Sequence, residues 1–242
     1  MCGHISDNVM LKVNDISTGY GKKQVLFDVS FEVCKGEIIL IAGSNGSGKS
    51  TLLKAIYGIL KLWNNGQIFF DGEKITGKPT ATLLKKGLLY IPQKNNLFED
   101  LTVKENLEMA GLTLKQNQLK QQIENALSIF TTLEPHLNRT SMKLSGGERQ
   151  LLTLAMATLH QPKMILIDEP FTGLSPQNIN FVSENLKILN DKSGITLMIV
   201  EHRVKECLQI ANKVIGLKLG NVFAKLELEA NFNVHELNSL FT

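Results

Sequence analysis

Nine consecutive residues near the start of the chain have the composition of a phosphate-binding loop. The segment from Gly43 to Thr51 reads G-S-N-G-S-G-K-S-T and fits the pattern G-x-x-x-x-G-K-[ST]. Glycines let backbone N–H groups surround phosphate oxygens, and the start of a following helix adds partial positive charge. In such a loop Lys49 contacts the β- and γ-phosphates, and the Ser50 hydroxyl is a ligand of Mg²⁺. The candidate binding residues are Gly43, Ser44, Asn45, Gly46, Ser47, Gly48, Lys49, Ser50 and Thr51.

Two carboxylates directly follow a short apolar run. The run Met164–Ile167 precedes Asp168 and Glu169. At the carboxyl end of a parallel strand both side chains would lie in the crevice where ligands bind. We expect Asp168 to help hold Mg²⁺ and Glu169 to orient or deprotonate an attacking water. The alternative is an acidic pair that only caps a strand, and the presence of a phosphate loop disfavours it.

A third segment, from Leu144 to Gln150, reads L-S-G-G-E-R-Q. Ser145 and Glu148 have the spacing of a capping box, which predicts the start of a helix. Gly146 and Gly147 would leave the first N–H groups of that helix approachable by an anion, such as a second phosphate chain. An ordinary capped helix start explains the same residues, and the segment alone does not separate the two readings.

The elements that must position these residues alternate between strands and helices. Short apolar or alternating runs predict strands, and apolar residues at helical spacing predict helices between them. Predicted strands include residues 29–34, 38–42, 67–70, 88–91, 164–168, 196–201 and 214–217. From about residue 94 to residue 160 the pattern is helical, with a second capping box at Thr102 and Glu105. We therefore predict an α/β fold with a mainly parallel sheet and an inserted helical lobe.

Length and composition agree with one domain. The chain has 242 residues, and Lys+Arg 26 against Asp+Glu 23 leaves a formal net charge of +3. This charge is too small to favour nucleic acid or anionic lipid as the main partner. No run approaches the roughly 20 apolar residues of a membrane helix, and residues 1–10 lack the pattern of a signal peptide. Cys2, Cys34 and Cys207 form no zinc or disulfide pattern, which favours a reducing cytoplasm.

The three motifs occur together in the order and spacing of a known family. The chain resembles the ATP-binding subunit of ATP-binding cassette (ABC) transporters from about Met10 to Val222. The resemblance implies a P-loop NTPase core with a mainly parallel sheet, an N-terminal antiparallel part and an inserted helical lobe. It also implies one ABC domain over residues 1–242. Residues 1–93 and 161–242 would form its catalytic core, and residues 94–160 its inserted helical subdomain.

The resemblance assigns roles to further residues. Tyr20 matches the aromatic residue that stacks on adenine, and Gln93 matches the glutamine that contacts Mg²⁺ and the attacking water. His202 matches the histidine that contacts the γ-phosphate and supports Glu169. The implied catalytic residues are Glu169, His202 and Gln93, and the implied metal-binding residues are Ser50, Gln93 and Asp168. His4, His136, His160 and His235 match no family position.

The resemblance also implies partners. Two subunits, identical or paired, would sandwich ATP and Mg²⁺, with Ser145, Gly146 and Gly147 of one subunit facing the phosphate loop of the other. Membrane-spanning permease subunits would hold the chain at the cytoplasmic face of the membrane, and a solute-binding protein would deliver cargo; no nucleic acid is expected. Leu97 and Phe98, just after Gln93, are candidates for the permease contact, although they could equally belong to the core of the lobe.

Within the family, Tyr-Ile-Pro-Gln before the lobe and Gly-Leu-x-Pro after Glu169 resemble the branched-chain amino acid and urea uptake branch. Ser175 stands where many members have aspartate, and Glu148 replaces the commoner glutamine. The alternatives are a soluble ABC ATPase of iron–sulfur cluster assembly and a lipopolysaccharide-export ATPase.

Overall fold

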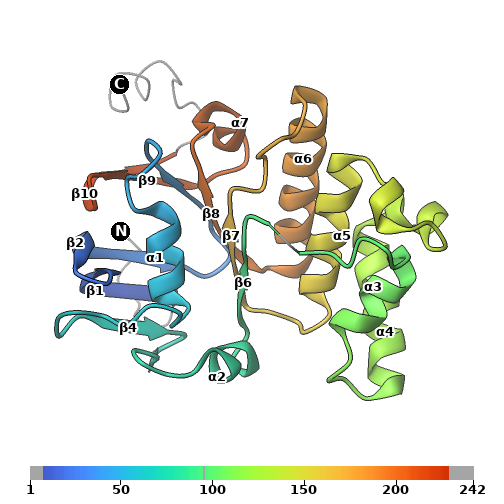
Figure 1. Ribbon diagram of the computed structural model, residues 1–242, viewed down its shortest axis with the longest axis horizontal. Helices are drawn as coiled ribbons and strands as arrows, with labels where there is room; N and C mark the ends of the chain where they lie inside the picture. Colours follow the sequence, from blue (N-terminus) through green and yellow to red (C-terminus); the bar gives the residue numbers. More distant parts are fainter. Residues whose placement is uncertain (1–7, 95, 229–242) are drawn as a thin grey trace.

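The computed structural model describes residues 8–94 and 96–228 and contains two sheets (Figure 1). The larger sheet has six strands in the order β10-β9-β3-β8-β7-β6. Its strands are parallel from β9 to β6, and β10 pairs antiparallel with β9. The strands are β3 (Ile38–Ala42), β6 (Leu88–Ile91), β7 (Met164–Asp168), β8 (Thr196–Glu201), β9 (Lys213–Lys218) and β10 (Asn221–Glu227).

The smaller sheet is antiparallel and comes from the first part of the chain. Its four strands lie in the order β2-β1-β4-β5. They are β1 (Val9–Tyr20), β2 (Lys23–Cys34), β4 (Gln67–Phe70) and β5 (Glu73–Lys74). The predicted α/β class, with a mainly parallel sheet and an N-terminal antiparallel part, is confirmed.

The helices divide between the two sides of the parallel sheet. Helix α1 (Lys49–Ile56) lies on the side of the antiparallel sheet, and α5 (Gly146–Thr158) and α6 (Pro176–Ser193) lie on the other (Figure 1). The other α-helices of the described residues are α2 (Thr80–Lys85), α3 (Val103–Ala110), α4 (Gln116–Ile129) and α7 (Val204–Leu208), and short 3₁₀ helices span Thr131–His136 and Ser141–Lys143. The capping boxes predicted at Thr102 and Ser145 are both present.

Strand alternation produces one apolar cluster on each side of the parallel sheet. In β7, Met164 and Leu166 pack into the cluster that contains α1 and the antiparallel sheet. Ile165 and Ile167 pack into the opposite cluster with α3, α4, α5 and α6. The helical segment over residues 94–160 therefore shares its core with the sheet, because the same apolar cluster continues from β7 into that segment.

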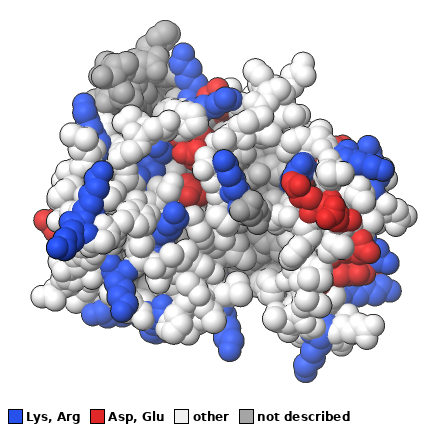
Figure 2. Space-filling model, in the orientation of Figure 1, with Lys and Arg blue, Asp and Glu red and all other residues white. Residues whose placement is uncertain are grey.

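Charge is distributed unevenly over the surface. On the face shown in Figure 2, basic side chains are scattered over both halves, whereas acidic side chains are most concentrated over the helical half. Among the described residues, no helix combines the length and the apolar character needed to cross a membrane.

One expectation about cysteines was wrong. Cys34 is disulfide-bonded, and Cys207 is free and buried. The spacing of cysteines along a chain does not show which thiols approach within bonding distance after folding. The cysteines therefore lend no support to a reducing compartment. The predictions for Cys2, His4 and His235 lie outside the described residues.

A buried amide holds the segment that enters the helical region. Asn106 in α3 is fully buried, and its Nδ2 donates to the carbonyl oxygens of Phe98, Leu101 and Thr102 at 2.9–3.2 Å. Its Oδ1 accepts from the N–H of Phe98 at 2.9 Å. The side chain therefore replaces the backbone partners that residues 98–102 lack in this irregular stretch.

Asn106→Ala removes these partners and leaves buried backbone groups unsatisfied. We expect the free energy of unfolding in urea to fall by about 3 kcal/mol. Asn125→Ala, at an exposed position of α4, is the matched control and should change it by less than about 0.5 kcal/mol. Equal unfolding midpoints for the two variants would contradict the role given to Asn106.

Candidate active site

The glycine-rich loop connects the end of β3 to the start of α1. Gly48 has φ +105°, and a Cβ at this position would lie 2.8 Å from Cδ2 of Leu26. Gly46 also has a positive φ, of +82°. Larger residues would strain this backbone, so the sequence folds here into a tight concave turn before a helix N-terminus. Such a turn is the arrangement that binds phosphate groups.

Lys49 places a buried positive charge under this loop. Its Nζ donates to the carbonyl oxygens of Gly43 at 2.9 Å and Ser44 at 3.1 Å, and the side chain is 4% exposed. Burial lowers the pKa of Lys49, and the carboxylates of Glu169 and Asp168 oppose that shift. A bound polyphosphate would favour the charged form further, because opposite charges attract strongly in a partly buried site.

Asp168 joins the phosphate loop to the parallel sheet. Its Oδ1 accepts from the hydroxyl of Ser50 at 2.8 Å, and its Oδ2 accepts from the hydroxyl of Tyr90 at 3.1 Å. Burial raises the pKa of Asp168, against the effect of these two hydrogen bonds. The carboxylate and the Ser50 hydroxyl form an adjacent pair of hard oxygen donors, which suits Mg²⁺.

A metal ion at this point would need ligands from outside the chain. The described residues contain no group of three or more His, Cys, Asp or Glu side chains able to hold a metal. Mg²⁺ commonly binds one or two protein oxygens and completes its octahedron with phosphate and water. The donor set therefore fits Mg²⁺ that arrives with a nucleotide.

The direction of the Glu169 side chain is set by an unusual backbone conformation. Its φ is +48°, which is rare for a residue other than glycine and turns the side chain away from the regular strand direction. Its Oε2 accepts hydrogen bonds from Nε2 of Gln93 and, at 3.0 Å, from Oγ1 of Thr172. Nδ1 of His202 lies 4.0 Å from the same oxygen. Gln93, Glu169 and His202 thus meet just beyond the carboxyl ends of β6, β7 and β8.

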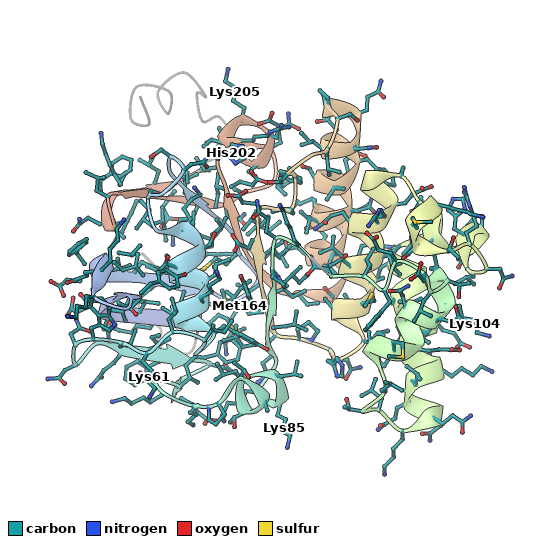
Figure 3. The ribbon with its side chains drawn as sticks, in the orientation of Figure 1. Lys61, Lys85, Lys104, Met164, His202 and Lys205 are labelled. Atoms are coloured by element: carbon teal, nitrogen blue, oxygen red, sulfur yellow. The ribbon has the colours of Figure 1, made fainter. Side chains whose placement is uncertain are left out.

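This meeting point lies at one edge of the parallel sheet. Figure 3 shows His202 beyond the carboxyl end of β8, whereas Met164 marks the opposite end of β7. Parallel strands all present their carboxyl ends at one edge, and ligands of open α/β sheets bind there.

Glu201 is a buried carboxylate that the sequence analysis missed. Its Oε1 accepts from the N–H of Phe171 at 2.8 Å, and its Oε2 accepts from the N–H groups of His202 and Arg203. It therefore ties the segment after Glu169 to the segment that carries His202. Burial raises its pKa. An acidic residue directly after an apolar run, at the end of a predicted strand, was the available signal, since such residues are buried only with partners.

A groove of about 590 Å³ lies beside the loop and fits the size of a small-molecule site. Tyr20, at the end of β1, lines it together with Phe27 and Leu219, and all three are substantially exposed. Phe27 and Leu219 were missed, because β2 and the turn after β9 approach the loop only in the folded chain. The groove is lined by Tyr20, Lys23, Gln24, Val25, Phe27, Asn45, Gly46, Gly48, Lys49, Ser50, Thr51, Glu169 and Leu219.

The start of α5 is separate from this groove. Ser145 and Gly146 are exposed and do not line it, and the Ser145 hydroxyl accepts from the N–H of Glu148. A Cβ at Gly146 would lie 2.8 Å from Cδ2 of Leu174, and one at Gly147 would lie 3.1 Å from Phe181. The glycines thus let α5 pack closely against α6 and the turn before it.

Other predicted positions have ordinary structural roles. Ser175 is the N-cap of α6, and its hydroxyl accepts from the N–H of Asn178 at 3.4 Å. A serine fills this position as an aspartate would, because both are preferred N-caps. His136 pairs with Glu148 at 3.0 Å, and His160 contacts the carbonyl of Ala110. Leu97 packs against the helical core, whereas Phe98 is 51% exposed.

Comparisons with known proteins agree with this geometry. The family model described as ABC transporter matches residues 26–172. The chain is 38% identical over 213 residues to the probable branched-chain amino acid transport ATP-binding protein LivF of Archaeoglobus fulgidus, covering 88% of this chain and 90% of that one. It is 36% identical to the high-affinity branched-chain amino acid transport ATP-binding protein BraG of Pseudomonas aeruginosa, covering 88% and 91%.

A solved structure extends the likeness to three dimensions. A bacterial ABC transporter cassette in a dimeric structure superposes with a TM-score of 0.77 at 27% identity, covering 91% of this chain and 100% of that one.

The lowered pKa of Lys49 predicts a pH dependence of nucleotide binding. Bound phosphate raises this pKa, so binding takes up a proton between the pKa of the free protein and that of the complex. We expect ATP affinity to fall as the pH rises above the free-protein value, by up to about tenfold per pH unit.

Equilibrium titration of the wild type with ATP from pH 7 to pH 10 measures this slope. Lys49→Gln should bind weakly with little dependence on pH, whereas Lys163→Gln, at an exposed lysine, should keep the wild-type slope. An ATP affinity that is constant up to pH 10 in the wild type would contradict the prediction.

Proposed function

The chain belongs to the ABC transporter family, and we propose that its ATPase activity drives an uptake transporter for branched-chain amino acids or similar small polar solutes. The observation that carries the ATPase part of this proposal is the convergence of Lys49, Asp168 and Glu169 at one edge of the parallel sheet, and the similarity to LivF and BraG carries the transport part. These residues supply a phosphate-binding cation, a metal-binding carboxylate and a candidate base within one site.

We propose that Lys49 and the loop N–H groups bind the phosphates of ATP while Ser50 and Asp168 hold Mg²⁺. The metal would neutralise charge that develops on the transferred phosphoryl group. Tyr20 would stack on the adenine ring, since it stands at the exposed rim of the groove. Stacking of a base on an aromatic side chain contributes about 1–3 kcal/mol.

Glu169 is the proposed general base for the attacking water. Its Oε2 is held by Gln93 and Thr172, which keep the carboxylate in one orientation. His202, 4.0 Å from that oxygen, would support the carboxylate and contact the γ-phosphate. Gln93 would also contact the metal, and it begins the segment that leads from β6 into the helical region.

The proposed active unit contains two copies of the cassette. Ser145 and Gly146 are exposed and lie outside the groove of their own chain. This placement suits a helix start that donates N–H groups to a nucleotide on another cassette. The dimeric arrangement of the similar cassette supports the same proposal. Closure would then depend on contacts to ATP that exist only in the closed state.

The proposed partners are permease subunits, a second cassette and a solute-binding protein, at the cytoplasmic face of a membrane. Phe98, which is 51% exposed, is the proposed apolar contact with the permease. The similarity to two branched-chain amino acid transport ATP-binding proteins favours transport over iron–sulfur assembly or lipopolysaccharide export.

Glu169→Gln tests the proposed base. We expect ATP binding to persist and hydrolysis to fall by about 10²–10⁴-fold, because an amide does not accept the proton of water. Phosphate release measures the loss of hydrolysis. Size-exclusion chromatography with ATP measures the persistent binding, because the variant with bound ATP should accumulate as a dimer. Glu184→Gln, at an exposed position of α6, is the control. Normal turnover in Glu169→Gln would remove Glu169 from the role of base.

The partners are tested by co-purification. The tagged chain at native expression should be isolated from gently solubilised membranes together with polytopic permease subunits. Phe98→Glu should weaken this association while ATP hydrolysis by the isolated chain stays unchanged. Recovery of the wild type only in complexes without membrane proteins would exclude a transporter role.

A further inference from the structure

Tyr90, at the third position of β6, contacts the same carboxylate as Ser50. Its hydroxyl donates to Oδ2 of Asp168 at 3.1 Å, while the Ser50 hydroxyl donates to Oδ1 at 2.8 Å. The two oxygens of Asp168 are thus held by donors from two different elements. The sequence assigns no role to Tyr90.

The alternation of the sheet explains this approach. Leu88 and Tyr90 face the apolar cluster that contains α1, as do Met164 and Leu166 of the neighbouring strand. Asp168 continues the same alternation one step beyond Leu166, at the carboxyl end of β7. Tyr90 pairs in register with Leu166, so its long side chain reaches diagonally across to the carboxylate.

Two contacts hold the side chain of Tyr90 in one position. The ring lies against that of Tyr57, with centroids 5.7 Å apart, and Tyr57 directly follows the last residue of α1. At its other end the hydroxyl donates to Oδ2 of Asp168, so the side chain is held both at its ring and at its polar tip.

We propose that Tyr90 is a positioning residue for the metal site, which orients the carboxylate of Asp168 toward Ser50. This inference rests on the proposed Mg²⁺ site. A carboxylate held at one oxygen could rotate about its side-chain bonds, whereas one held at both oxygens keeps its plane. Because β6 leads to Gln93 three residues later, Tyr90 also fixes the start of the segment that supplies the amide beside Glu169.

A purely structural role for Tyr90 makes a different prediction. The ring alone would fill the space between α1 and β6, and phenylalanine would fill it equally well. The hydroxyl then would contribute nothing to metal affinity. Tyr90→Phe separates the two roles, since it keeps the ring and its apolar contacts.

The experiment measures metal and nucleotide affinity separately. Mn²⁺ binding to the ADP complex is followed by electron paramagnetic resonance, and ADP binding in EDTA is followed by calorimetry. We expect Tyr90→Phe to weaken Mn²⁺ binding by about tenfold, as is typical when a residue that orients a metal ligand is lost. Its ADP affinity in EDTA should equal that of the wild type.

Tyr57→Phe is the matched control, because it removes a hydroxyl from the other tyrosine of the pair and should retain wild-type Mn²⁺ affinity. Equal Mn²⁺ affinity in Tyr90→Phe and Tyr57→Phe would overturn the proposal. A Tyr90→Phe variant that loses ADP affinity in EDTA as well as Mn²⁺ affinity would also overturn it. A wild-type complex that holds no Mn²⁺ beyond what ADP binds alone would overturn the metal site itself and, with it, the role of Tyr90.

Discussion

The carboxylate of Asp168 is the point at which the phosphate loop, the parallel sheet and the segment leading to Gln93 are joined. It is 4% exposed, and it accepts from Ser50 at the start of α1 and from Tyr90 on β6. A buried carboxylate is tolerated only when its oxygens find donors or a cation. The requirement to satisfy this group therefore fixes the distance between α1 and the strand end, which is where phosphate and metal would lie.

Two further carboxylates, Glu169 and Glu201, hold the segments that follow β7 and β8 at the same edge of the parallel sheet. Glu169 follows its strand with a positive φ and accepts from the amide of Gln93, while Glu201 accepts from backbone N–H groups in the segments that follow β7 and β8. Glu169, the proposed base, and His202 therefore belong to segments that are bound to one shared buried carboxylate. Rearrangement of one segment should disturb the other, because Glu201 accepts hydrogen bonds from both.

The packing of the helical segment bears on how nucleotide state could reach a partner. The apolar cluster on the α5 and α6 side continues without interruption from β7 into α3 and α4. Asn106 holds residues 98–102 rigidly against α3 by four hydrogen bonds to backbone groups. Phe98, the proposed permease contact, is therefore joined through Asn106 and α3 to the same apolar cluster that reaches β7.

The sequence alone determined the features that depend only on neighbouring residues. The glycine-rich loop, the acid pair after the apolar run and both capping boxes depend on contacts within a few residues, so residue types and spacing predicted them. The fold class followed as well, because alternating strands and helices admit few arrangements. The family resemblance supplied Gln93 and His202, and the tertiary structure places both beside Glu169.

Only the tertiary structure decided the contacts between distant segments. Tyr90 and Asp168 are 78 positions apart, and Glu201 meets a backbone group 30 positions away. Phe27 and Leu219 reach the groove from separate strands, and the disulfide at Cys34 was not foreseen. The physical reason is common to all of them. Such contacts arise from strand order and register, and these are set by the burial of apolar surface across the whole chain, which no local pattern specifies.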